Sequence, residues 1–268
     1  MAKENIVLLH GKIHNMPKVY ANNDGTLVKA MFALQVLRRP VRGGKFLSNK
    51  LYFDMPVVLI RDPEQIKQVC DFMQNDMVDI RGVLSTKECV KTTICPQCGQ
   101  KNSIKGTTTY VTPIYICKRE PAVSDEEALR LLKERCEVSN MAMVIGTLCR
   151  DPEIYTDEKN KSFAQYQLAV NRRYRIKEDS AETKTDYPWV KTVGEQALKD
   201  AYALKTGSQV YINGALQTRE ITRGTKCEYC EASYEWNDNA TEIIPYSTEY
   251  LSNCIVPEKE GGETNAES

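Results

Sequence analysis

Two Cys-x-x-Cys pairs are the residues of this sequence with the clearest capacity for chemistry. Cys95 and Cys98 form the first pair, and Cys227 and Cys230 form the second. A structural zinc site needs four ligands, and each pair supplies two thiolates. We therefore expect Cys95, Cys98, Cys227 and Cys230 to hold one structural zinc ion between them.

Other uses of these cysteines are open at this stage. A local site could use Cys89, Cys95, Cys98 and Cys117 and leave the second pair without a metal. The two pairs could also meet between the chains of a dimer, or they could be unligated thiols in a loop. A thioredoxin-type redox pair is less favoured, because it needs a βαβ context that the sequence does not offer.

Basic and aromatic residues interleave in two stretches of the chain. Arg172, Arg173 and Arg175 surround Tyr174, and Arg38, Arg39 and Arg42 lie in the matching stretch of the first half. A single cluster of this kind is typical of a solvated hairpin tip. Its recurrence favours a nucleic-acid surface, where rings stack on bases and cations meet phosphates.

The overall composition excludes several classes of protein. Lys+Arg and Asp+Glu number 36 each, so any basic surface must be local. There are only two histidines, no P-loop, and no nucleophile with a recognisable base, so we expect no enzyme and no small-molecule substrate. The sequence has no signal peptide and no run of about 20 apolar residues. These features predict a cytoplasmic protein without a membrane segment.

The chain contains an internal repeat. Ile80–Glu88 matches Ile212–Glu220 at an offset of 132 residues, and the two cysteine pairs keep the same offset. We expect a first domain over residues 1–120 and a second over 140–256. Ser124 and Glu127 form a capping box, which predicts a linker helix within residues 121–139. The acidic tail, residues 257–268, is predicted to be disordered.

Each copy of the repeat is predicted to be mostly β, with three strands, a short helix and two strands. In the second copy the strands are expected at 141–148, 163–174, 187–193, 209–220 and 241–250, with a helix at 196–204. In the first copy the same elements are expected at 6–12, 29–39, 50–60, 77–86 and 107–117, with a helix at 63–73. This order predicts an all-β protein of two tandem five-stranded OB-fold barrels, each with a short helix.

The second copy resembles bacterial single-stranded DNA-binding proteins over nearly all of residues 140–250. The resemblance rests on Val144–Tyr155, Leu168–Tyr174 and Lys205–Arg219, of which the last contains the characteristic Gly-Ser-Gln-Val-Tyr-Ile. The first copy resembles the family only weakly by itself. The family implies OB folds that stack bases of single strands on aromatic side chains.

The resemblance and the basic clusters together give a set of expected DNA-binding residues. These are Arg38, Arg39, Arg42, Tyr52, Tyr155, Arg172, Arg173, Tyr174, Arg175, Tyr187, Trp189 and Arg219. Pro40 stands where the second copy has Tyr174, so the first copy lacks one stacking position and is expected to bind weakly.

The expected function is to coat and protect single-stranded DNA, with little sequence preference, during replication, recombination or DNA transfer. The resemblance implies a homodimer that presents four OB domains. Two alternatives are a zinc-stapled protein-interaction hub and an accessory subunit of a DNA-processing complex.

Overall fold

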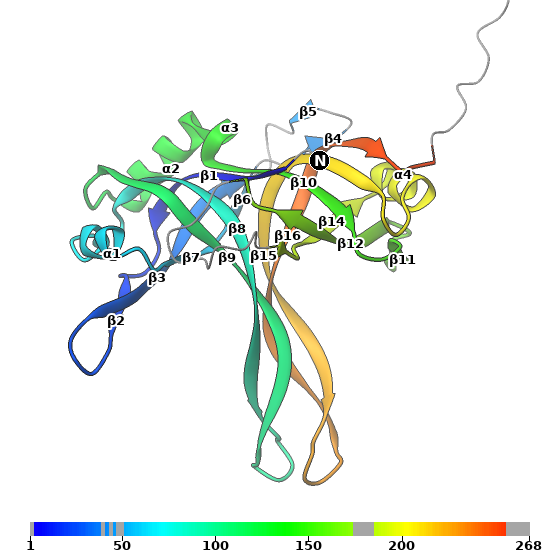
Figure 1. Cartoon of the computed structure of the whole chain (residues 1–268), viewed down its shortest axis with the longest axis horizontal. Coiled ribbons are helices and arrows are strands. Elements are labelled where there is room, and N and C mark those ends of the chain that lie inside the picture. Colours follow the sequence, from blue (N-terminus) through cyan, green and yellow to red (C-terminus); the bar gives the residue numbers. More distant parts are fainter. Residues whose placement is uncertain (1–2, 39–40, 43–44, 47–50, 174–184, 256–268) are drawn as a thin grey trace, which may run out of the picture.

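The computed structural model describes residues 3–38, 41–42, 45–46, 51–173 and 185–255. Strands dominate this part of the chain, which confirms the all-β class (Figure 1). The two Cys-x-x-Cys pairs lie at the ends of two long hairpins that leave the same side of the molecule (Figure 1). Within the described residues, every helix is too short or too polar to cross a bilayer.

The described residues of the first half form nine strands and one helix. Its elements are β1 (Glu4–Ile13), β2 (Lys18–Ala21), β3 (Leu27–Arg38), β4 (Val41–Arg42), β5 (Lys45–Phe46), β6 (Tyr52–Asp54), β7 (Val57–Ile60), α1 (Pro63–Val69), β8 (Met77–Ile94) and β9 (Lys101–Glu120).

Two short helices lead into the second half. The elements there are α2 (Asp125–Glu134), α3 (Cys136–Ser139), β10 (Asn140–Leu148), β11 (Glu153–Thr156), β12 (Ser162–Asn171), β13 (Thr185–Asp186), β14 (Trp189–Val193), α4 (Glu195–Ala203), β15 (Gln209–Lys226) and β16 (Ser233–Ser252). Ser124 caps α2 by accepting a hydrogen bond from the Glu127 amide, as the capping box predicts.

Strand pairing closes a five-membered ring in each half. In the first ring β1 pairs with β3 and β8, β3 pairs with β7, and β9 joins β7 to β8. In the second ring β10, β12, β14, β16 and β15 have the same pairings in the same order. In each ring one pairing is parallel, β7 with β9 in the first and β14 with β16 in the second, and the other four are antiparallel. A closed ring of five strands with one helix is the arrangement of an OB fold.

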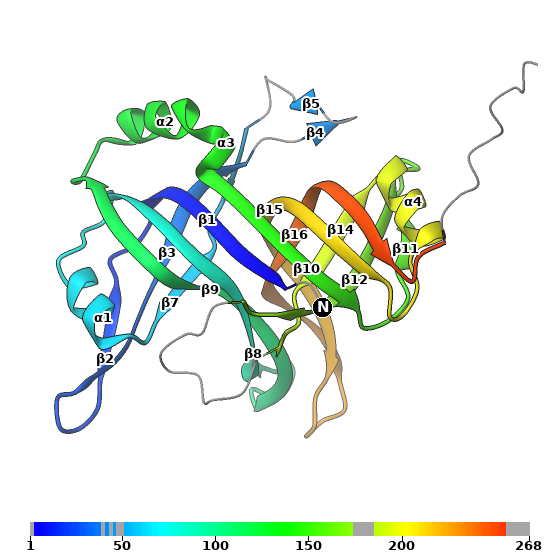
Figure 2. The same ribbon diagram turned by 45° about the horizontal axis from the view of Figure 1, so that its top comes forward.

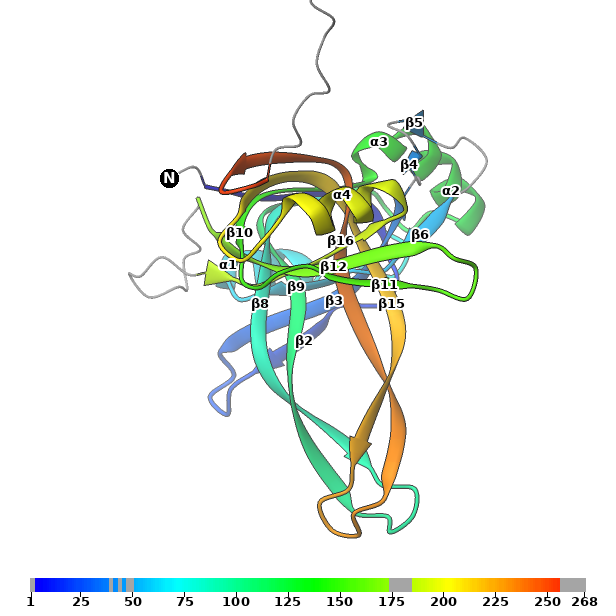
Figure 3. The same cartoon turned by 90° about the vertical axis from the view of Figure 1, so that its right-hand side faces the viewer.

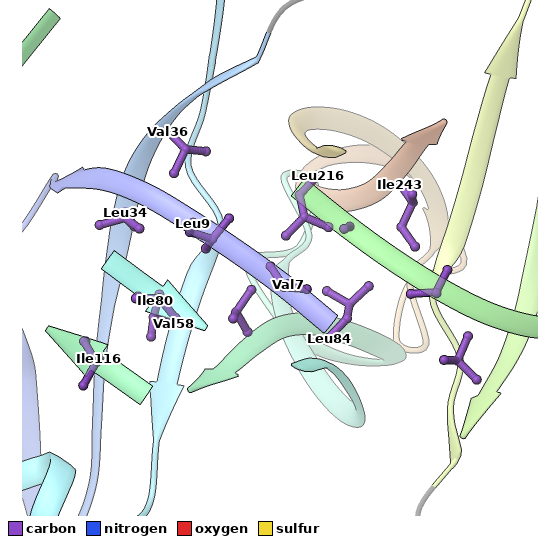
Figure 4. Close-up of a cluster of buried hydrophobic side chains, with 14 of the residues drawn as sticks. Val7, Leu9, Leu34, Val36, Val58, Ile80, Leu84, Ile116, Leu216 and Ile243 are labelled. Atoms are coloured by element: carbon purple, nitrogen blue, oxygen red, sulfur yellow. The ribbon is translucent and has the colours of Figure 1, made fainter. Parts of the chain in front are cut away.

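The two rings share one sheet and one core. β1 and β10 pair antiparallel from Glu4 against Ile145 to Leu9 against Asn140, so the sheet continues from one ring to the other (Figure 2). Alternate residues of β10, such as Ala142 and Val144, point inward and are fully buried. Buried side chains of both halves, among them Val7 and Leu216, belong to a single cluster (Figure 4).

The strands that carry the cysteine pairs are longer than the sequence analysis predicts. The predicted strands end at Thr86 and Glu220, whereas β8 runs to Ile94 and β15 to Lys226. Their partners β9 and β16 begin early by a similar length, so each half extends a two-stranded arm beyond its ring (Figure 3). The side of each extension that faces the other arm is largely polar, as at Thr93 and Asn102, so the sequence lacks the alternation of apolar residues that usually indicates a strand.

Two glycines at equivalent positions are required where β8 and β15 bend. The strand register shifts between Arg81 and Gly82 and between Asn213 and Gly214. A Cβ atom at Gly214 would lie 2.4 Å from the carbonyl oxygen of Ile244, and one at Gly82 would lie 2.5 Å from that of Thr112. Only a residue without a side chain allows this close approach of two backbones.

This packing predicts that Gly214→Ala destabilises the protein by about 1–3 kcal/mol, the usual cost of overpacking. Gly224→Ala is the matched control, because that strand position faces open space. We expect the control to stay within about 0.5 kcal/mol of the parent in urea unfolding. Equal stability of the two variants would contradict the account of the bend.

Candidate nucleic-acid interface and metal cluster

One face of the second ring carries aromatic rings with cations above them. The rings of Tyr155 and Phe163 are stacked, with centroids 5.2 Å apart. The Lys191 ammonium lies 4.8 Å from the centroid of Phe163 and 5.5 Å from that of Tyr155. The Arg150 guanidinium lies 4.4 Å from the ring centroid of Trp189. We call these five residues the aromatic face.

Strand geometry explains why these side chains meet. Tyr155 and Phe163 are direct partners in the pairing of β11 with β12. Trp189 and Lys191 are two residues apart on β14, so both side chains leave the same side of the sheet. All three rings are partly exposed, and each keeps a π-face near a positive charge. Such a surface suits flat anionic ligands.

The sequence analysis predicts Tyr155 and Trp189 at this face and misses Phe163, Lys191 and Arg150. The alternation of β14 was sufficient to find Lys191, because it is two residues from Trp189. Phe163 reaches the face through its pairing with Tyr155, and Arg150 reaches it from the segment after β10. These tertiary contacts leave no signal in the local sequence.

Other predicted binding residues lie elsewhere. Tyr187 is exposed just before β14, and Tyr52 is exposed under the guanidinium of Arg38, whose carbon lies 5.1 Å from the ring centroid. Arg42 lies in β4, and its side chain is outside the described part of the structure. Arg39, Tyr174 and Arg175 lie outside the described residues.

Arg38 and Arg172 are buried, each 8% exposed, instead of forming part of an open basic surface. The Arg172 Nε donates to Asp186 at 2.6 Å, and the Arg38 Nε donates to Asp54 at 2.7 Å. Burial raises the pKa of the Asp54 carboxyl, and the Arg38 charge opposes that shift. These two arginines therefore serve as counter-ions of buried carboxylates.

Arg219 and Arg173 differ from this pair. Arg219 donates two hydrogen bonds, each of 2.9 Å, to the buried carboxylate of Glu242, and this bonding raises the pKa of Arg219. Arg173 is exposed, with its guanidinium 3.7 Å from Glu4. Of the described arginines that the sequence analysis selects, Arg173 is the one whose side chain is exposed to solvent.

The buried carboxylates join the two rings. Asp186 accepts a hydrogen bond from the amide of Thr86 in β8, and the Thr86 hydroxyl accepts one from the amide of Tyr187. The same bonds recur with the halves exchanged: Asp54 accepts from the amide of Thr218 in β15, and the Thr218 hydroxyl accepts from the following amide, that of Met55. The start of each arm is therefore hydrogen-bonded to the ring of the other half.

The corresponding face of the first ring is aliphatic in part. Tyr20, which aligns with Tyr155, keeps a cation, because the ammonium of its cross-strand partner Lys29 lies 4.3 Å from the ring centroid. At the repeat offset, Trp189 and Lys191 align with Val57 and Leu59, which are half-buried on β7. Met31 on β3 and the exposed Met16 lie in the same region of that ring. The positions of Trp189 and Lys191 are therefore aliphatic in the first ring, whereas the position of Tyr155 keeps an aromatic ring.

The four cysteine sulfurs of the two pairs lie within 4.8 Å of one another. The Sγ atoms of Cys95 and Cys230 are 3.7 Å apart, and those of Cys98 and Cys227 are 3.6 Å apart. A tetrahedral site with metal–sulfur bonds of about 2.3 Å has sulfur–sulfur edges of about 3.8 Å. The cluster therefore matches the size of a four-thiolate metal site.

Hydrogen bonds orient the sulfurs of this cluster. Asn102 donates to the Cys227 sulfur from the other arm, and its Oδ1 accepts from the Glu228 amide. Burial raises the pKa of Cys227, but hydrogen bonds from the Cys230 and Tyr229 amides outweigh it and bring the pKa to about 6. Cys89 and Cys117, the remaining members of the local alternative, are not part of the described cluster.

Part of the second half is similar to known proteins. Residues 139–235 match the single-strand binding protein family. The chain is 30% identical over 112 residues to single-stranded DNA-binding protein 1 of Chlorobaculum tepidum, over 42% of this chain and 60% of that protein. It is 32% identical over 116 residues to the single-stranded DNA-binding protein of Rickettsia typhi, over 42% and 64%. The matches thus span less than two thirds of these relatives, and they confirm the resemblance inferred from residues 140–250.

The fold of the whole chain also has solved counterparts. The wild-type single-stranded DNA binding protein from Thermus aquaticus superposes with a TM-score of 0.59 and 16% identity, over 97% of this chain and 98% of that one. A deletion mutant of the same protein gives 0.60 and 16%, over 97% and 100%. At this identity the likeness shows a shared fold.

The buried ion pairs predict different effects for two neighbouring arginines. Arg172→Ala leaves the fully buried Asp186 carboxylate without its counter-ion and should lower the free energy of unfolding by about 3–5 kcal/mol. Arg173→Ala removes an exposed side chain and should change it by no more than about 0.5 kcal/mol. Urea unfolding of both variants provides the comparison. A stable Arg172 variant would show that this arginine is not a structural counter-ion.

Proposed function

We propose that this chain is a single-stranded DNA-binding protein with two tandem OB-fold domains. The domains are residues 1–120 and 140–256, joined by a linker over 121–139 and followed by a tail over 257–268. The protein coats single strands with little sequence preference and protects them during replication, recombination or DNA transfer. It binds DNA without catalysing a reaction, and its setting is cytoplasmic.

The observation that carries this proposal is the aromatic face of the second ring. Each ring offers a π-surface to a base, and every base has such a surface, so stacking is tolerant of sequence. Lys191 and Arg150 lie beside the rings, where the phosphates of a stacked strand need cations. The family match over residues 139–235 includes all five residues of this face and supports the same assignment.

Binding to oligo-dT tests the face residue by residue. Phe163→Ala and Trp189→Ala should each weaken binding by about 1–3 kcal/mol through the loss of one stacked base. Lys191→Ala should reduce the slope of log K against log salt by about 0.7. Fluorescence anisotropy of labelled oligo-dT across a salt series measures both effects.

Tyr202→Ala is the control for this experiment, because Tyr202 is a tyrosine on α4 that is 60% exposed and makes none of the ring contacts of the face. We expect it to bind as the parent does. Equal affinity for oligo-dT, oligo-rU and duplex, or equal losses in all four variants, would contradict the proposal.

The outer side of the shared sheet supports a homodimer. Leu8 on β1 and Met141, Met143 and Ile145 on β10 leave the sheet on the side opposite the core and are only half-buried. Tyr211 on β15 is the direct partner of Ile145 and extends this apolar patch. A second copy packed on the patch would bury these side chains and bring four OB domains into one assembly.

We further propose that the cysteine cluster holds a structural zinc ion shared by the two halves. All-sulfur, four-ligand sites of this size are characteristic of structural zinc. Because the ligands come from both arms, the ion would fasten arms that belong to different OB domains. Metal binding then contributes to the stability of the folded chain.

Metal analysis tests this assignment. Protein purified without chelators should contain one zinc ion per chain, and Cys227→Ser should lose it, since three thiolates no longer close the site. Cys254→Ser is the matched control, because Cys254 lies outside the cluster. Full zinc content in a Cys227→Ser, Cys230→Ser double variant would contradict a shared site.

One observation favours the interaction hub as a second function. The first ring has aliphatic side chains, Val57 and Leu59 among them, where the second ring has Trp189 and Lys191. These two positions on β7 suit a protein partner better than a nucleic acid. Normal oligo-dT binding by variants of Val57 and Leu59 would agree with such a division of roles.

A further inference from the structure

The outer side of the shared sheet carries different residues in the two halves of the chain. A row of cross-strand partners on β1, β8 and β9 has an equivalent row on β10, β15 and β16. The first row consists of His10, Asp79 and Cys117. The second row consists of Ile145, Tyr211 and Glu249. The first half therefore has a histidine and an aspartate where the second half has an isoleucine and a tyrosine, and only the second row ends in a carboxylate.

The first half has a hollow on this side, beside α3 and over β1, β8 and β9. Its volume is about 250 Å³. Leu8 and Val138 contribute apolar side chains to the lining, which also includes the three arginines Arg81, Arg119 and Arg135. Arg81 and Arg135 are exposed, and the Arg119 side chain is 48% exposed. The hollow is thus an apolar depression with guanidinium groups at the surface of the protein.

The hollow has an excess of positive charge. Asp79 is the one carboxylate among its described lining residues, and its two oxygens are each 2.6 Å from a nitrogen, one of His10 and one of Arg119. Burial raises the pKa of Asp79, but the hydrogen bonds from His10 and Arg119 outweigh it and lower the pKa. Three guanidinium charges therefore surround one ionised carboxylate, so the hollow attracts negative charge.

The second half carries no arginine at two of these positions. The repeat offset aligns Arg81 with Asn213 and Arg119 with Leu251. Asn213 is half-buried, and Leu251 is 43% exposed. A neutral amide and an aliphatic side chain thus replace two cations of the hollow.

The charges near Tyr211 on the second half are negative. Burial raises the pKa of the Tyr211 hydroxyl, and the negative charges of Glu249 and Glu4 raise it further. Glu249 is exposed and has no ion-pair partner among the residues that the structure describes, whereas Glu4 lies 3.7 Å from Arg173. The outer side of the second half is therefore apolar with an acidic edge.

The two surfaces are complementary to each other and not to themselves. A second copy that packs first half on first half would bring the arginines of both hollows together and leave the two Glu249 carboxylates without cations. Juxtaposed like charges strongly disfavour an interface. Packing of unlike halves places the acidic edge against the hollow, and a two-fold axis makes this contact occur twice.

We propose that in the homodimer the first half of each chain packs on the second half of its partner, with the arginine-lined hollow against the edge that carries Tyr211 and Glu249 of the partner subunit. This inference rests on the proposed homodimer and adds its orientation. The apolar patch of β1 and β10 lies between the two reciprocal contacts. Burial of that patch supplies affinity, and the charges at its two ends select the orientation.

Charge reversal tests the orientation. The basic-side variant is Arg81→Glu with Arg135→Glu, and the acidic-side variant is Glu249→Lys. Arg119 is left unchanged, because it is bonded to Asp79. Either variant alone brings like charges together at both contacts, and its dimer dissociation constant should rise by about tenfold or more. Sedimentation equilibrium at low salt measures this constant.

Two combinations of these substitutions should restore the dimer. All three substitutions in one chain exchange the signs at both contacts, so opposite charges face each other again. An equimolar mixture of the two variants should form a heterodimer, in which one contact is native and the other has exchanged signs. Packing of like halves predicts that neither variant alone weakens the dimer.

The control variant is Lys18→Glu with Lys159→Glu, two exposed lysines on β2 and in the turn between β11 and β12. It changes the net charge by the same amount as the basic-side variant and should dimerise as the parent does. The orientation is wrong if neither variant alone weakens the dimer, or if the chain with all three substitutions is as weak as each variant. A monomeric parent would instead contradict the proposed homodimer itself. Circular dichroism and urea unfolding verify that each variant is folded.

Discussion

The arrangement of the molecule depends on two buried aspartates that each bond the opposite half of the chain. Asp186 holds the amide of Thr86, and Asp54 holds the amide of Thr218. A buried carboxylate is tolerable only when its charge is compensated, and Arg172 and Arg38 supply that compensation. Because these bonds cross between the rings, each arm is fixed against the ring to which it does not belong.

This crossed arrangement lets one duplicated fold produce two different sides. The pairing of strands is the same in both rings, and so are the buried arginine–aspartate pairs. The surface residues have diverged. The second ring has Trp189 and Lys191 where the first ring has the aliphatic Val57 and Leu59, and only the first ring's Tyr20 keeps an aromatic side chain at the position of Tyr155.

The sequence alone predicts the features that depend on local residue patterns or on the internal repeat. The offset between the cysteine pairs predicts that equivalent thiols can meet, and the four sulfurs do cluster. The alternation of apolar and polar residues predicts strand β10. It also predicts that Trp189 on β14 is partly exposed. The length of the arms was not predictable in the same way, because an arm buries little and shows no apolar periodicity.

The roles of the arginines could not be read from the sequence either. Arg172 and Arg173 are adjacent and chemically identical, yet one is a buried counter-ion and the other is exposed. The difference arises from strand alternation combined with the position of Asp186, which lies 14 residues away and contacts Arg172 through the fold. The positions of Lys191 and Arg150 beside aromatic rings also depend on the fold, because other strands carry those rings.

The most direct test of this account is photocrosslinking of the full-length protein to a long oligo-dT in which iodouracil replaces scattered thymines, followed by mass spectrometric mapping of the crosslinked residues. Crosslinks are expected at Tyr155, Phe163, Tyr187 and Trp189. Crosslinks concentrated on β7 of the first ring would contradict this expectation.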